Sequence, residues 1–158
     1  MRLCMGAISS FEANGNGIGR IRMRCIPDAS SESLLPFIEN VIEPGSIVRT
    51  DGWSGYSRLS NLGYRHEVKV LRGKGKSAST ELLPRVHRVS SLLKRWLLGT
   101  YQGAVSTEHL DSYLDEFTFR FNRRTSKSRG KLFYRLIQQA VQVDPVTYRD
   151  IVRSVHDV

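Results

Sequence analysis

The first part of the chain alternates apolar and polar residues, the pattern of half-buried β-strands. Residues 3–12 and 17–26 are each expected to form a strand, and Asn14-Gly15-Asn16-Gly17 between them tolerates the positive φ angles of a hairpin turn. In the second strand the apolar side chains should face a core, while the opposite face carries arginines. These arginines either contact phosphates or form the solvated side of a half-buried or edge strand. The two faces are Ile21, Met23 and Cys25 on one side, and Arg20, Arg22 and Arg24 on the other.

Beyond the hairpin, helical and strand-like periods alternate until the pattern becomes helical throughout. Pro27-Asp28-Ala29-Ser30 opens the first helix, and Pro44-Gly45 ends it. We therefore expect a single α/β domain over 1–158 with a helical C-terminal half. The elements expected after the hairpin are a helix through Leu34, Leu35, Ile38 and Ile42, a buried strand at 47–50, a short helix with Trp53, Tyr56 and Leu59, a strand at 64–70, a mobile basic loop at 72–80, and helices from Pro84 to Gly99, from near Ser106 to Phe121, and around 132–140.

The charge balance bears on whether the chain binds an anionic partner. The chain has 24 Lys and Arg against 15 Asp and Glu, a net charge of +9, which favours nucleic acid; a basic domain that binds nothing anionic fits the charge equally well. Cys4 and Cys25 have no metal-ligand spacing and are expected to be reduced core residues of a cytoplasmic protein. No apolar stretch approaches the ~20 residues that span a bilayer, so we expect no membrane partner. Trp53 and Trp96 are also expected in the core.

Asp51 has the most informative position of the acidic residues. It follows a predicted strand, and ligands collect at the carboxyl ends of strands in open α/β sheets. A carboxylate held there is suited to coordinate a metal ion. Alternatively, Asp51 caps the helix that contains Trp53, because Asp is a favoured N-cap residue. The residues alone leave both roles open.

The helix predicted from Pro84 carries a polar stripe opposite its apolar side. His87 and Lys94 are two helical turns apart, so they lie on one face, roughly 10 Å from each other along the axis. This separation would allow His87 to reach a metal ion while Lys94 holds a neighbouring phosphate. Taken alone, a His and a Lys on a helix surface are more often only solvated.

Four segments of the sequence form a family pattern. They are Thr50-Asp51-Gly52-Trp53-Ser54-Gly55-Tyr56, Gly63-Tyr64-Arg65-His66, Leu92-Leu93-Lys94-Arg95-Trp96-Leu97-Leu98-Gly99-Thr100 and Leu114-Asp115-Glu116-Phe117-Thr118-Phe119-Arg120-Phe121-Asn122-Arg123-Arg124. Together they resemble the DDE-type transposases of bacterial insertion sequences, in the ISXO-like branch. The resemblance covers essentially the whole chain, and its most specific part is the last segment.

The resemblance implies a ribonuclease-H-like mixed sheet that holds two divalent metal ions, normally Mg²⁺, between acidic residues. Asp51 matches the family's second catalytic aspartate. The third catalytic position carries Glu or Asn in this branch, seven residues before a Lys, and alignment on Lys94 puts His87 there. The implied catalytic residues are therefore Asp51, His87 and Lys94, with Asp51 and His87 as metal ligands.

Two departures from the family pattern change what is expected of this chain. Imidazole brings no negative charge, so at His87 either the affinity for Mg²⁺ falls or a softer ion such as Mn²⁺ is better tolerated. The family's first catalytic aspartate lies on a strand before the hairpin, where this sequence starts, and neither Glu12 nor Asp28 matches its motif. Without that central first strand, two strands expose unpaired backbone groups, and we expect the chain alone to be poorly soluble or partly unfolded.

The resemblance also implies the partners: transposon ends and target DNA, and further copies of the chain in a homo-oligomeric active complex. We distinguish a metal-dependent DNA transposase domain that cleaves and joins strands, a truncated inactive product that binds DNA or intact transposase, and a domain without a nucleic-acid role, which the resemblance disfavours.

Basic residues should hold DNA through its phosphates, although any one of those in the connector at 122–131 is equally well explained as part of a solvated turn. The expected DNA-binding residues are Arg88, Lys94, Arg95, Arg123, Arg124 and Lys127.

Overall fold

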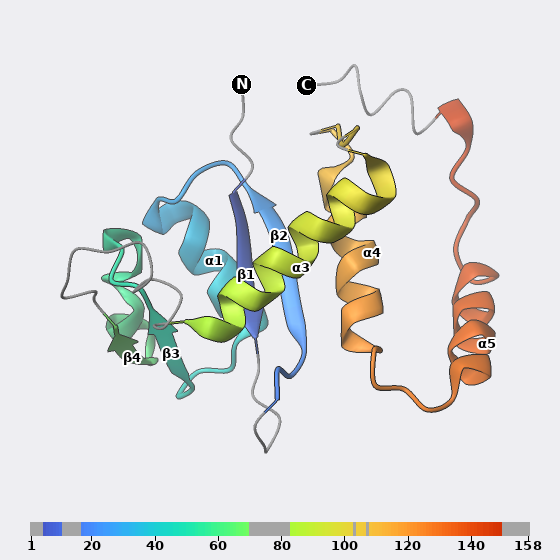
Figure 1. The fold of residues 1–158 in the computed structure, drawn as a ribbon. Coiled ribbons are helices and arrows are strands. Elements are labelled where there is room, and N and C mark those ends of the chain that lie inside the picture. Colours follow the sequence, from blue (N-terminus) through green and yellow to red (C-terminus); the bar gives the residue numbers. More distant parts are fainter. Residues whose placement is uncertain (1–4, 11–16, 70–82, 103, 107, 150–158) are drawn as a thin grey trace. The chain divides into compact units, whose positions relative to one another are not determined.

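The computed structural model describes residues 5–10, 17–69, 83–102, 104–106 and 108–149 (Figure 1). Cys4, most of the predicted hairpin turn and the basic loop at 72–80 lie outside these residues. The chain divides into two compact units, Met1–Asn122 and Arg123–Val158. All the described strands belong to the first unit, which also contains Asp51 and His87.

The predicted hairpin is confirmed. β1 (Met5–Ser10) pairs antiparallel with β2 (Ile21–Ile26), and both strands are drawn in blue in Figure 1. Cys25 is half-buried, so it lies at the margin of the core and not inside it. The predicted alternation along β2 is also confirmed, with Ile21 and Met23 buried and Arg20, Arg22 and Arg24 exposed.

The first helix, α1 (Ser31–Val41), begins where the sequence predicted. The Ser30 hydroxyl oxygen accepts a hydrogen bond from the Ser33 N–H at 3.3 Å, and Asp28 accepts one from the Ser30 N–H at 2.9 Å. These bonds satisfy backbone donors that the first turn of a helix leaves without partners. The helix buries Leu34, Leu35, Phe37 and Ile38.

A second, parallel sheet follows α1. β3 (Ile47–Thr50) pairs with β4 (Arg65–Val68), and Val48 packs with α1 in a hydrophobic cluster. The expectation of a buried β3 was half right, because Val48 and Thr50 are buried whereas the residues beside them are exposed. The cluster contains Leu35, Phe37, Ile38, Val48, Leu59 and Tyr64.

Two 3-10 turns, η1 (Ser54–Tyr56) and η2 (Leu59–Leu62), connect β3 to β4 where one short helix was expected. The prediction was wrong because Ser and Gly residues dominate this stretch and favour short turns over a propagating α-helix. Trp53 lies before η1 and is 55% exposed, so its expected core position was also wrong.

The helices α3 (Pro84–Tyr101) and α4 (Leu110–Asn122) form the other hydrophobic cluster with β2. Trp96 was expected in the core and lies at its margin: it is half-buried and packs against the cluster, with its ring 5.3 and 5.6 Å from those of Tyr101 and Phe117 between centroids. The buried members of the cluster are Ile21, Met23, Val89, Leu114, Phe117 and Phe121.

Both helix boundaries differ from those expected. α3 passes through Gly99 and ends at Tyr101, because one Gly costs a helix only about 1 kcal/mol and the Trp96–Tyr101 contact holds the added turn. Gln102 is the C-cap residue that follows, in a left-handed conformation with a φ of 50°. α4 starts at Leu110, later than near Ser106, with Asp111 in its first turn.

The two sheets are not hydrogen-bonded to each other among the described strands. Side chains of α4 cover the outer edge of β2. The Asn122 side chain accepts the Ile21 N–H at 2.7 Å and donates to the Ile21 carbonyl at 2.9 Å, and Asp111 accepts the Cys25 N–H at 3.0 Å. Amide and carboxylate groups thus take the place that a neighbouring strand would occupy.

Gly55 marks the closest approach of η1 to the start of α1. A Cβ added there would lie 2.6 Å from the Ala29 carbonyl oxygen and 2.8 Å from Leu34 Cδ1. Gly55→Ala should therefore lower the free energy of unfolding in urea by about 1–3 kcal/mol, the usual cost of overpacking. Gly99→Ala is the control: its Cβ meets open space inside a helix, and it should stabilise by about 0.5–1 kcal/mol. Equal effects of the two changes would contradict the close approach.

The second unit contains α5 (Arg129–Ala140), the helix expected around 132–140. No residue of α5 is buried. Its apolar side chains recur at helical spacing, and Phe133 and Ile137 are 66% and 46% exposed. Among the helices of both units that the structure describes, none is long and apolar enough to cross a membrane.

Candidate active site

Asp51 lies one residue beyond the end of β3, as predicted, and is exposed. Gly52 follows it with a φ of 84°, a left-handed conformation that glycine adopts without strain and that turns the chain sharply. Asp51 Oδ1 accepts the Trp53 N–H at 3.2 Å. The carboxylate therefore closes a short turn, whereas η1 itself has no side-chain cap. Its other oxygen, Oδ2, has no hydrogen-bond partner in the described part of the chain.

A pair of polar side chains, buried Thr50 and half-buried His66, lies beside Asp51. Thr50 is only 5% exposed, and its Oγ1 is 2.8 Å from His66 Nε2 on β4. The same Oγ1 accepts the Gly52 N–H at 3.4 Å, so the pair supports the turn that carries Asp51. Sequence reasoning assigned His66 no role. His66 is the second residue of β4 and lies in register with Val48, so its contact with Thr50 depends on the pairing of the two strands, which the local sequence does not specify.

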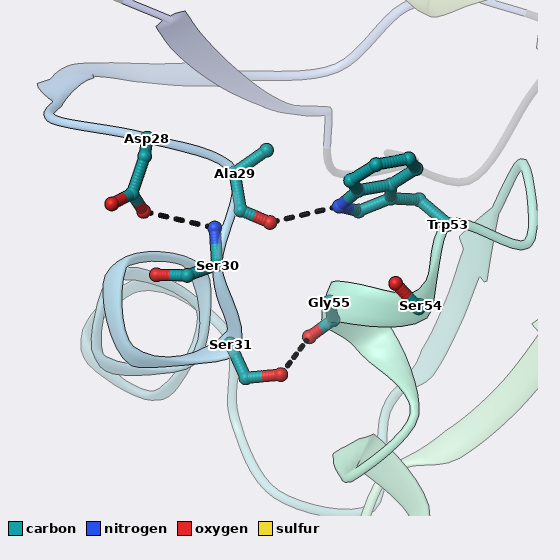
Figure 2. Close-up of a pocket in the computed structure, with 7 residues that line it drawn as sticks. All are labelled: Asp28, Ala29, Ser30, Ser31, Trp53, Ser54 and Gly55. Atoms are coloured by element: carbon teal, nitrogen blue, oxygen red, sulfur yellow. Dashed lines mark hydrogen bonds between the residues drawn. The ribbon is translucent and has the colours of Figure 1, made fainter.

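Two aromatic residues surround the turn after Asp51. Burial raises the pKa of Tyr56 above its usual value, and the negative charge of Asp51 raises it further, so the phenol keeps its proton at neutral pH. Trp53 donates its indole N–H to the Ala29 carbonyl at 2.8 Å (Figure 2). The turn is therefore attached to the segment that precedes α1.

The helix α3 carries the other expected site residues. His87 is half-buried in the first turns of the helix, where its backbone N–H donates to the Leu83 carbonyl at 3.1 Å. Lys94 is exposed. Both lie in one continuous helix, so the predicted sharing of a helix face is confirmed. Within the described residues, no hydrogen bond or ion pair joins Asp51 to His87 or Lys94.

The expected DNA-binding residues are all exposed but belong to different units. Arg88 and Arg95 lie on α3, one residue beyond His87 and Lys94 respectively. Arg123, Arg124 and Lys127 lie in the turn before α5, in the second unit.

The described residues do not by themselves fit a two-metal centre. They contain no group of three or more His, Cys, Asp or Glu side chains that could hold a metal ion. Asp51 supplies one carboxylate, whereas Mg²⁺ is bound through several oxygen ligands in octahedral geometry. A two-metal centre at this position would need acidic ligands beyond those of the described residues.

Comparison with known proteins assigns the chain to a family. The family model of the ISXO2-like transposase domain matches residues 4–122, which end where the first unit ends. A protein of Haemophilus influenzae named as an uncharacterized transposase-like protein is 26% identical over 118 residues, which are 72% of this chain and 89% of that protein. No solved structure is similar enough to count as a match. Because the family model covers most of its length, the chain belongs to the ISXO2-like transposase family.

Proposed function

We propose that this chain is the catalytic part of a DNA transposase that cleaves DNA at transposon ends and joins the freed 3′-hydroxyl to a target strand. The observation that carries the proposal is the position of Asp51, exposed just beyond β3 and inside the region matched by the family model, with one carboxylate oxygen that no described residue hydrogen-bonds. The proposal requires that neutralising Asp51 abolishes strand cleavage while DNA binding is retained.

The proposed roles follow the family pattern. Asp51 is an oxygen ligand of a divalent metal ion, Mg²⁺ or Mn²⁺, and His87 is a nitrogen ligand. Lys94 holds a phosphate of the substrate. The net charge of +9 supports a polyanionic partner. The active complex would contain several copies of the chain with transposon ends and target DNA.

The proposed sheet is ribonuclease-H-like, with a further strand between the hairpin and the parallel pair. Two features support it: β1–β2 and β3–β4 are separate sheets in the described part of the first unit, and the outer edge of β2 is covered by α4. A strand paired with β1 on one side and with the parallel sheet on the other would unite them into one mixed sheet. That strand is where the family carries its first catalytic aspartate.

Phosphate contacts by α3 can be tested through their salt dependence. Replacing both Arg88 and Arg95 with Ala should reduce the slope of log K for duplex DNA against log salt concentration by about 1.8, since each phosphate contact contributes about 0.9. A matched change of Arg135 and Arg149, two exposed arginines of the second unit outside the basic connector, to Ala should leave the slope nearly unchanged. Identical slopes for the three proteins would contradict phosphate binding by α3.

The second candidate function is that of an inactive transposase product that binds DNA or intact transposase. The lack of a metal-holding group among the described residues favours it. The DNA upstream of the codon for Met1 discriminates the two. An in-frame segment that encodes a strand with the family's first aspartate supports the enzyme, and a stop codon without such a segment supports the inactive product.

A further inference from the structure

A hollow of about 370 Å³ lies between the start of α1 and η1, next to the turn that carries Asp51 (Figure 2). Trp53 and Ser54 line it on one side, and Asp28, Ser30 and Ser31 on the other. This volume lies at the lower end of the range for small-molecule sites, about 300–1,000 Å³. The hollow therefore suits one flat ring system and not a large ligand.

The Trp53 ring is held in place although 55% of the residue is exposed. Its indole N–H donates to the Ala29 carbonyl at 2.8 Å, and its backbone N–H donates to Asp51 at 3.2 Å. Because the only polar atom of the indole is already bonded, the exposed surface of the ring offers stacking and not hydrogen bonding. Within the described residues, no aromatic ring packs against it.

The two walls of the hollow are joined to each other. The Ser31 hydroxyl donates to the Gly55 carbonyl at 3.0 Å, and Gly55 approaches Ala29 so closely that no side chain fits between them. A ligand would thus meet a preformed surface, which reduces the ordering cost of binding.

The charge of the hollow selects a neutral group over a phosphate. Asp28 accepts hydrogen bonds from the Ser30 N–H at 2.9 Å and from the Ser33 hydroxyl at 2.7 Å. Hydrogen bonding by the Ser30 side chain, then by the Ser30 N–H and the Ser33 hydroxyl, lowers the pKa of Asp28, so its carboxylate stays ionised at neutral pH. An ionised carboxylate repels phosphate but accepts hydrogen bonds from the N–H groups of a nucleobase.

We propose that this hollow binds an unpaired nucleobase of the substrate DNA, stacked on Trp53, next to the turn that carries Asp51. The proposal deepens the proposed function and rests on it. Stacking uses the π-face that every base has, so it positions the strand without requiring a sequence. A base inside an intact duplex cannot enter, which restricts the site to overhangs, nicked ends or flipped bases.

The test is metal-free binding of the full chain to a labelled single strand and to the same strand with abasic positions, measured by fluorescence anisotropy. Trp53→Ala should weaken binding of the intact strand roughly 5- to 150-fold, the range for loss of one stacked base, and should bring it close to the abasic value. Trp53→Phe should restore most of the affinity, since a phenyl ring stacks without the indole N–H. Tyr134→Ala, at a 63% exposed position of α5, is the control and should bind like the unaltered chain.

Unchanged affinity of Trp53→Ala for the intact strand overturns the proposal, as does an equal loss of affinity for the intact and abasic strands. Unchanged DNA affinity together with a lower melting temperature also overturns it, because the ring would then pack within the protein. These outcomes differ from failure of the proposed function. If the chain stacks bases through Trp53 but cleavage does not depend on Asp51, the catalytic assignment fails and the nucleobase site stands.

Discussion

Neutralising Asp51 should abolish strand cleavage and leave DNA binding intact. In Asp51→Asn the side-chain oxygen that accepts the Trp53 N–H is kept, so the turn should survive, while the negative charge is lost. Removing partners in the outer shell of a metal site typically costs 10- to 100-fold, and a direct ligand should cost more. We expect a loss of more than about 100-fold in the rate of cleavage at transposon ends, measured with Mg²⁺ and with Mn²⁺.

This measurement needs the longest in-frame product that contains the chain, because the described residues lack a complete metal-holding group. Glu39→Gln is the matched control, since it removes one exposed carboxylate from α1, away from the turn after β3. It should cleave at the unaltered rate. Cleavage retained by Asp51→Asn would remove Asp51 from the metal site. No cleavage by the unaltered product would favour the inactive alternative.

Asn122→Ala should destabilise the first unit more than any other single exposed or half-buried polar change. Its side chain bonds to both the N–H and the carbonyl of Ile21, which is itself fully buried. Each backbone group left without a partner costs about 1–3 kcal/mol. We expect the free energy of unfolding to fall by about 2–4 kcal/mol, and the melting temperature by roughly 10 °C.

Asn61→Ala is the control for this change. Asn61 is exposed on η2, and surface changes of this kind usually stay within about 0.5 kcal/mol. Urea unfolding followed by circular dichroism measures both variants. A loss for Asn122→Ala no larger than that for Asn61→Ala would mean that water satisfies the edge of β2 as well as the amide does.

Elements with strong periodicity were predictable from the sequence, and weak ones were not. The alternation of β2 and the cap of α1 at Ser30 depend on local residue types, and both appear as expected. The segment from Trp53 to Leu62 carries apolar residues at helical spacing, but its Ser and Gly content favours short 3-10 turns. The exposure of Trp53 could not be predicted, because a tryptophan in a core and one on a surface have the same local pattern.

The candidate site was predictable one residue at a time, but not as an assembly. The place of Asp51 after a strand follows from apolar and turn residues nearby, and the shared face of His87 and Lys94 follows from helix geometry. Whether those groups meet depends on how α3 packs, which no local pattern specifies. Similarly, nothing near Asn122 indicates that it bonds to Ile21, a residue 101 positions earlier.

That long separation has a consequence for synthesis of the protein on the ribosome. The hairpin is complete once Ile26 has been made, but the amide that covers the edge of β2 is 101 residues downstream of Ile21. At about 5–20 residues per second, translation leaves this edge uncovered for roughly 5–20 s. Neighbouring nascent chains on one messenger can pair through it during that interval. Slower translation between the hairpin and α4 should therefore lower the yield of correctly folded protein, even though the finished molecule is unchanged.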